Sequence, residues 1–127
     1  MDLVVLNNIF SIYRFKNNSV LPDWIYLSDF YSITKTRDEL SVIALQNDII
    51  SKEFTCNKDW RILKVVGPLD FSLVGIIADI STILKAKKIS IFTISTYDTD
   101  YILVKQKDLK IAIKALTDKE YNIEIEK

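Results

Sequence analysis

Two short segments of the chain carry residues whose types and spacing could bind a small charged ligand. The first, Gly67-Pro-Leu-Asp-Phe-Ser-Leu-Val-Gly75, joins a β-branched run to an amphipathic pattern and holds both glycines of the sequence. The N–H groups and positive dipole of a helix start favour a ligand carboxylate. Asp70 could pair with a ligand ammonium, and Gly75 would allow close approach. The simpler interpretation is that Gly75 relieves helix–sheet crowding and Asp70 is an alternative cap.

The second segment, Ser95-Thr-Tyr-Asp-Thr-Asp100, places six polar side chains in succession at the end of a predicted strand. They could supply hydrogen-bond donors and a carboxylate to the same ligand. The alternative is a hairpin turn, in which Asp and Thr are common. Asp98 suits the turn itself. Asp100 begins the next strand, where a carboxylate is less expected, and is therefore the better functional candidate.

The absence of some residue types excludes several kinds of chemistry. The sequence has no histidine and a single cysteine, Cys56. Zinc sites built on His/Cys clusters and all histidine-based catalysis are thereby excluded. The acidic pairs Asp98/Asp100 and Asp38/Glu39 lie at predicted turns, where carboxylates are common, so we expect no metal and no cofactor. An enzyme is the least favoured class, because its acid or base would have to be Asp, Glu, Lys or Tyr.

Length and charge narrow the class further. The 127 residues suffice for one domain or two very small ones, and 17 basic residues balance 17 acidic ones. Zero net charge argues against a general nucleic-acid binder. No apolar run approaches the roughly 20 residues of a membrane-spanning helix, and the first residues do not form a secretory signal. A single cysteine fits a reducing compartment, so we expect a cytoplasmic protein without membrane or nucleic-acid partners.

The C-terminal half shows alternating strand and helix patterns. Residues 61–66 predict a strand, and apolar spacing from Leu73 to Leu84 predicts a helix capped by Ser72. Residues 89–95 and 100–105 predict a hairpin, Asp108 starts a second helix, and residues 121–126 predict a last strand. This β-α-β-β-α-β order is ferredoxin-like: an α+β fold with two helices on one face of an antiparallel sheet.

The N-terminal half shows a weaker version of this pattern. Residues 9–15, 30–34, 40–45 and 53–56 predict strands, with short helical turns at 21–26 and 47–51. Residues 31–43 align without gaps to residues 92–104, an offset of 61, which predicts two similar units with the first shortened. Strand residues are apolar on both faces, so we expect packing between units or between chains.

Two segments, residues 60–76 and 91–104, resemble the small bacterial tandem ACT-domain proteins. The marks are Gly67-Pro-Leu-Asp-Phe71, Gly75-Ile76 and Ser95-Thr-Tyr-Asp-Thr-Asp-Tyr101. The modules of this group are similar to aspartokinase regulatory domains, and the CASTOR-type arginine sensors are related. The resemblance implies tandem βαββαβ modules: a shortened ACT-like module at 1–58 and an ACT module at 59–127.

In that group the ligand is an amino acid held at an interface between modules, often in a dimer. Carried over by position, the resemblance implies that these residues contact the ligand: Leu73, Val74, Gly75, Ile76, Thr96, Tyr97, Thr99 and Asp100. Leu73 stands where the arginine-sensing type has an acidic group, so a small or apolar amino acid is equally possible.

The sequence therefore predicts a non-catalytic amino-acid sensor that forms a homodimer. The alternative is a structural or assembly module that has no ligand and acts through its sheet faces.

Overall fold

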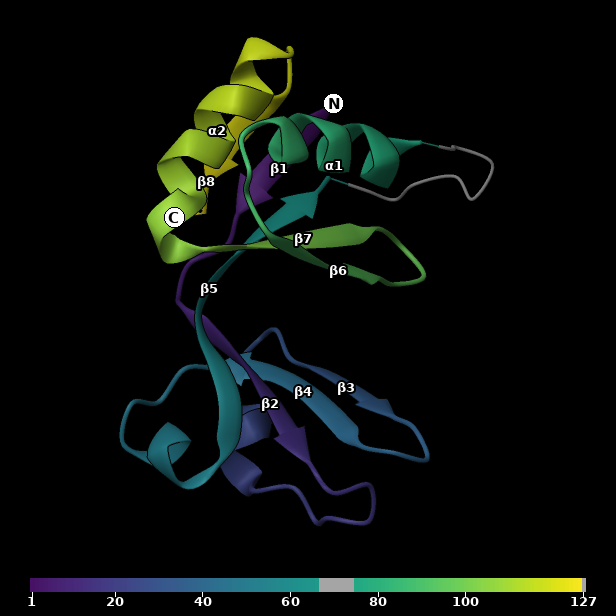
Figure 1. Cartoon of the computed structure of the whole chain (residues 1–127), viewed down its shortest axis with the longest axis vertical. Helices are drawn as coiled ribbons and strands as arrows, with labels where there is room; N and C mark the ends of the chain where they lie inside the picture. The colour runs from purple at the N-terminus through teal and green to yellow at the C-terminus, as the bar shows by residue number, and fades with distance from the viewer. Residues whose placement is uncertain (67–74, 127) are drawn as a thin grey trace. The chain divides into compact units, whose positions relative to one another are not determined.

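The computed structural model describes residues 1–66 and 75–126 and consists of two compact units (Figure 1). The C-terminal unit combines Met1–Asn7 with Arg61–Lys127, and the N-terminal unit is Asn8–Trp60. The strands are β1 (Asp2–Val5), β2 (Phe10–Phe15), β3 (Ser32–Lys35), β4 (Leu40–Leu45), β5 (Thr55–Val65), β6 (Ile91–Ser95), β7 (Asp100–Lys105) and β8 (Asn122–Ile125). The helices are α1 (Ile76–Ala86), α2 (Leu109–Asp118) and the 3₁₀ turns η1 (Asp23–Leu27), η2 (Ile50–Glu53) and η3 (Gln106–Asp108).

The C-terminal unit has the predicted α+β, ferredoxin-type arrangement. Its strands lie in the order β6-β7-β5-β1-β8, and α1 and α2 contribute to one core against the sheet. Alternate residues of a strand share a face, so Leu63 and Val65 of β5 meet Ile80 and Leu84 of α1 in that core. Burial of this shared apolar face holds the two helices on the sheet.

The strand β1 was not predicted, and it changes the sheet. Leu3 and Val5 are fully buried, and β1 lies antiparallel to β5 and parallel to β8. The expectation of a purely antiparallel sheet is therefore wrong: the sheet is mixed. These pairings also place Met1–Asn7 with the C-terminal unit, whereas the predicted first module began at residue 1. A strand of four residues reveals no long-range partner by itself, which is why the sequence did not show this pairing.

The N-terminal unit repeats the element order with much shorter helices. Its strands lie in the order β3-β4-β2-β5. In the order of elements along the chain, η1 and η2 correspond to α1 and α2 of the other unit. Counted along its own chain, this strand order is that of a ferredoxin-like sheet. Ile25 of η1 is fully buried and packs in one core with Tyr13 and Val42. The strand expected at 53–56 is the start of β5, which continues without interruption to Val65.

The internal repeat is present in the hairpins, but its offset is 60 rather than 61. In β3–β4, Lys35 pairs with Leu40, and in β6–β7, Ser95 pairs with Asp100. The turns agree, since the Thr36 hydroxyl accepts from the Glu39 N–H at 3.1 Å and the Thr96 hydroxyl accepts from the Thr99 N–H at 3.2 Å. The gapless alignment of apolar residues was off by one because it ignored this turn chemistry.

The helix starts were predicted less well than the helices themselves. α1 begins at Ile76 with Gly75 as its N-cap residue, so the start expected just after Ser72 is wrong. Gly75 has a φ of 89°, a left-handed conformation that an α-helix does not continue through. α2 begins after Asp108 as expected, although the Asp108 side chain makes no capping bond. Within the described residues, no helix is long and apolar enough to cross a membrane.

Candidate functional site

The β6–β7 hairpin is fixed to the end of β5 by a buried hydrogen bond. The Thr99 hydroxyl donates to the carbonyl oxygen of Val65 at 2.6 Å, and only 4% of Thr99 is exposed. The turn itself is closed by Thr96, whose N–H donates to the Thr99 carbonyl oxygen at 2.8 Å. Thr99 therefore positions the hairpin relative to the end of β5, and its hydroxyl is already used in doing so.

Asp100 is the first residue of β7 and faces the side of the sheet that the helices cover. It shares this face with Ile102 and Val104, which lie in the core with α1 and α2. Asp100 is half-buried, and its carboxylate accepts a 2.6 Å hydrogen bond from the Ser95 hydroxyl across the hairpin. A carboxylate can accept further hydrogen bonds beside this one.

Gly75 stands immediately before α1 with open space beside it. A Cβ built on Gly75 would meet no atom within 4 Å. The Gly75 carbonyl oxygen accepts from the Asp79 N–H at 2.7 Å, which begins the helical bonding. The N–H groups of the first turn have no earlier carbonyls within the helix to bond, and the positive dipole end there suits an anion. Ile76 is half-buried and packs against the core.

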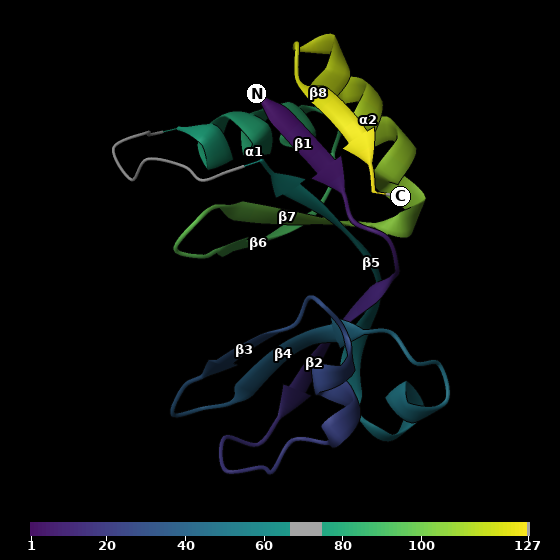
Figure 2. The ribbon, with the colours of Figure 1, turned by 180° about the vertical axis from the view of Figure 1, so that it is seen from behind.

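The remaining predicted residues differ in their placement. Tyr97 is 83% exposed at the tip of the β6–β7 hairpin, beside the exposed Thr96. Figures 1 and 2 show this tip and the start of α1 at the same edge of the C-terminal unit. The fold thus brings two of the predicted groups, Gly75–Ile76 and Thr96–Asp100, to one edge. The other candidates lie outside the described residues: Asp70, Ser72, Leu73 and Val74.

One feature of this unit was missed from the sequence. The Tyr121 hydroxyl, at the end of the α2–β8 connection, donates a short hydrogen bond to the carboxylate of Asp79 in the first turn of α1. Burial, and then the bond to Asp79, raises the pKa of Tyr121 to about 12. This contact joins the start of α1 to the start of β8, and no local pattern in the sequence relates residues 79 and 121.

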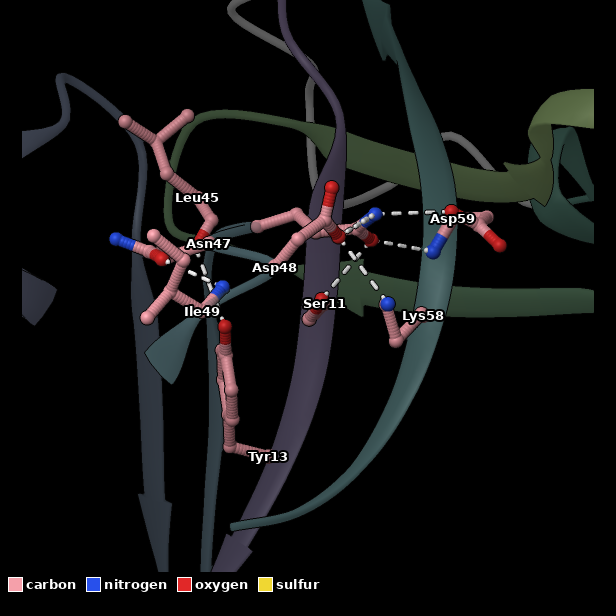
Figure 3. A network of polar contacts seen from close by, with 9 residues as sticks. Ser11, Tyr13, Leu45, Asn47, Asp48, Ile49, Lys58 and Asp59 are labelled. Carbon is pink, nitrogen blue, oxygen red and sulfur yellow. Dashed lines mark hydrogen bonds and ion pairs between the residues drawn. The ribbon is translucent and has the colours of Figure 1, made fainter. Parts of the chain in front are cut away.

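A polar network in the N-terminal unit was also missed (Figure 3). The buried Ser11 hydroxyl donates to Gln46 Oε1 at 3.0 Å, and the Asp59 N–H donates to the same oxygen at 2.6 Å. Asp59 has a φ of 69° where β5 bulges against β2. Gln46 Nε2 donates to Asp59 Oδ1 at 2.9 Å. Gln46 thus holds an otherwise unfavourable backbone conformation, which is a structural role.

The edge of this network is solvent-exposed. Lys58 forms a 3.1 Å ion pair with Asp48. The hydrogen bond from Lys58 lowers the pKa of the Asp48 carboxyl. Nearby, the Tyr13 hydroxyl donates to the Leu45 carbonyl oxygen at 3.4 Å, and burial raises the pKa of Tyr13. Among residues 1–66 and 75–126, no group of three metal-ligating side chains lies together.

Comparison with known families gives two matches. A model of the ACT domain matches residues 55–118. A second model, described as that of an N-terminal domain, matches residues 8–52, within the N-terminal unit. No curated protein matches this sequence.

Several solved structures are also similar to this chain. A structural-genomics protein from Agobacterium tumefaciens is 32% identical, with a TM-score of 0.89 over 99% of this chain and 93% of that chain. A Vibrio cholerae protein, described as of unknown function and possibly in transport, is 17% identical, with a TM-score of 0.74 over 92% of this chain and 88% of that one. A putative C-terminal regulatory domain of aspartate kinase from Porphyromonas gingivalis is 19% identical, with a TM-score of 0.55 over 91% and 94%.

Proposed function

Because this chain belongs to the ACT-domain family, we propose that it is a non-catalytic regulatory protein that binds a free amino acid. The site is the edge of the C-terminal unit where α1 begins and the β6–β7 hairpin ends. The similarity to a regulatory domain of aspartate kinase supports a regulatory role. We further propose that both units are ACT-like modules, since they share the ferredoxin-like order of elements.

The observation that carries the proposal is the open left-handed Gly75 at the start of α1. A helix start with free N–H groups and a positive dipole suits a carboxylate, and the absence of a side chain lets that carboxylate approach the backbone. Asp100 faces the same side of the sheet and retains acceptor capacity, which suits an ammonium group. The two ends of an α-amino acid are thereby matched by two groups of opposite character.

The other predicted residues complete this proposal. Ile76, Thr96 and Tyr97 border the edge, while Thr99 holds the hairpin in place. Within the segment that precedes Gly75, we propose that Asp70, Ser72, Leu73 and Val74 also contact the ligand. We propose that the site operates in a homodimer in which a second copy covers the ligand, and that the protein acts in the cytoplasm.

A thermal-shift screen against the twenty amino acids tests the proposal. A ligand at about 100 times its dissociation constant adds about 2.7 kcal/mol to the stability of the folded state. Size-exclusion chromatography with light scattering, with and without the ligand, then tests the dimer. Stability unchanged by all twenty amino acids at millimolar concentration would contradict amino-acid binding.

A second candidate function is assembly without a ligand. The N-terminal unit exposes large apolar side chains on η1 and beside β3, namely Tyr26 at 48%, Leu27 at 79% and Tyr31 at 42%. Exposed apolar groups gathered in this way are typical of protein-binding surfaces. A constant oligomeric state together with indifference to every amino acid would favour this function over the first.

A further inference from the structure

The outer face of the N-terminal sheet contains a hollow that the proposed function does not use. It has a volume of about 330 Å³ and is lined by Ile12, Tyr13, Arg14, Glu39, Ser41, Thr55, Cys56 and Asn57. This volume lies at the lower end of the range for small-molecule sites. Every lining residue belongs to the N-terminal unit, so the hollow is a feature of that unit alone.

The strand register explains which polar residues line this hollow. Arg14 pairs with Ser41 of β4 on one side and with Thr55 of β5 on the other, so three polar residues form a row across three strands. Ile12 pairs with Asn57 in the neighbouring row. Ile12 and Arg14 share one face of β2, while Phe15, which lies in the core, belongs to the other. The hollow therefore combines apolar surface with hydroxyl, amide, guanidinium and carboxylate groups.

The two charged residues of the hollow are both attached to the β3–β4 turn. One guanidinium nitrogen of Arg14, Nη2, donates to the Asp38 carbonyl oxygen at 3.1 Å, which leaves its other N–H groups for a ligand. The backbone of Glu39 is fixed by Thr36, whose N–H donates to the Glu39 carbonyl oxygen at 2.9 Å. Arg14 and Glu39 form no ion pair with each other or with other described residues. A cation and an anion beside one hollow are complementary to a zwitterion.

We propose that this hollow is a second ligand site, which takes a small zwitterion of the α-amino-acid class. Arg14 binds the carboxylate through its remaining N–H groups, Glu39 binds the ammonium group, and the hydroxyl groups of Ser41 and Thr55 hydrogen-bond the rest of the ligand. Guanidinium–carboxylate hydrogen bonds are stronger than neutral ones, which makes Arg14 the principal anchor. This site is separate from the edge beside Gly75 and does not depend on the proposed function there.

Amide NMR spectra of the full chain, titrated with each of the twenty amino acids, test the proposal. An amino acid that binds will shift the amide signals of Ile12, Arg14, Ser41 and Asn57. Its N-acetyl and carboxamide derivatives each lack one charge and will bind with an affinity lower by a factor of about ten or more. Absence of shifts at these residues with all twenty amino acids at tens of millimolar would overturn the proposal, as would equal binding of the derivatives.

Matched variants assign the recognition to the two charges. Arg14→Gln and Glu39→Gln are expected to weaken binding at the hollow about tenfold or more, while the controls Arg37→Gln and Glu53→Gln, outside the hollow, leave it unchanged. Well-dispersed spectra of each variant verify folding. Unchanged binding in both hollow variants would overturn the proposal. Signals of Gly75 and Asp100 report the other site separately, so either site can fail without the other.

Discussion

The Thr99 hydroxyl donates a 2.6 Å hydrogen bond to the carbonyl oxygen of Val65, and this contact fixes the β6–β7 hairpin to the end of β5. Val65 is fully buried and Thr99 nearly so. The bond is buried, and it places Asp100, the next residue, at the start of β7. Thr99 is a positioning residue for the proposed site.

Replacement of Thr99 by valine removes this donor while nearly preserving the side-chain shape. We expect Thr99→Val to lower the free energy of unfolding by about 1–2 kcal/mol, because a buried hydrogen bond is lost. Urea denaturation followed by circular dichroism measures the change. Thr93→Val, at an exposed position of β6, is the control and should have little effect. Equal stability of the two variants would show that the Thr99 bond does not contribute.

Replacement of Gly75 tests its left-handed conformation. The open space beside Gly75 accommodates a methyl group, but its φ of 89° is unfavourable for any residue with a Cβ. We expect Gly75→Ala to cost about 1 kcal/mol of stability, and Gly75→Asn to cost less because asparagine tolerates this region better. The two melting curves provide the comparison. An alanine variant as stable as the wild type would contradict a left-handed Gly75.

The bond from Tyr121 to Asp79 predicts a loss of stability at alkaline pH. The folded-state pKa of Tyr121 is raised from 10.0 to about 12, so the fold favours the protonated hydroxyl. Its contribution is therefore complete below pH 10 and is lost as the pH rises through 12. Denaturation curves across this range should show the loss in the wild type but less of it in Tyr121→Phe. Identical pH profiles would contradict the raised pKa.

The strand β1 predicts that the first residues of the chain are structural. Leu3 is fully buried in the core of the C-terminal unit, whereas Val4 points to the other face and is partly exposed. We expect Leu3→Ala to lower the free energy of unfolding by about 3 kcal/mol and Val4→Ala to lower it less. Chemical denaturation of both variants measures the difference. Similar small losses in both would show that β1 is not integrated into the sheet.

The sequence predicted features that depend on local patterns and missed those that depend on distant partners. The apolar spacing that leads to Leu84 identified α1, and the alternation through Asp100 identified β7. The same periodicity could not locate the start of α1 at Ile76, because apolar spacing does not indicate the backbone conformation of Gly75. Residues 2–5 acquire their role only by pairing with β5 and β8, more than 55 residues away.

In the candidate site, too, residues with a local sequence signal were predicted and contacts between distant residues were missed. Asp100 was recognisable as a carboxylate at an unusual strand position. It lies on the helix-covered face with Ile102 and Val104, and its contact with a ligand stays a prediction. Thr99 was predicted as a ligand contact through the family resemblance, whereas its burial and its bond to Val65 depend on the packing of β7 against β5. The link between Tyr121 and Asp79 joins residues 42 positions apart, and nothing in the local sequence indicates it.

Calorimetric titration of the full chain with the twenty amino acids tests the central proposal most directly, with Asp100→Asn compared against Asp98→Asn. Asp98 is an exposed turn residue two positions away and is a matched control for the loss of one charge. We predict that at least one amino acid binds the wild type and Asp98→Asn with equal affinity. The same amino acid is expected to bind Asp100→Asn with an affinity lower by a factor of about ten or more. Binding that is equal in both variants, or absent from the wild type for all twenty amino acids, would contradict an amino-acid site at the start of α1.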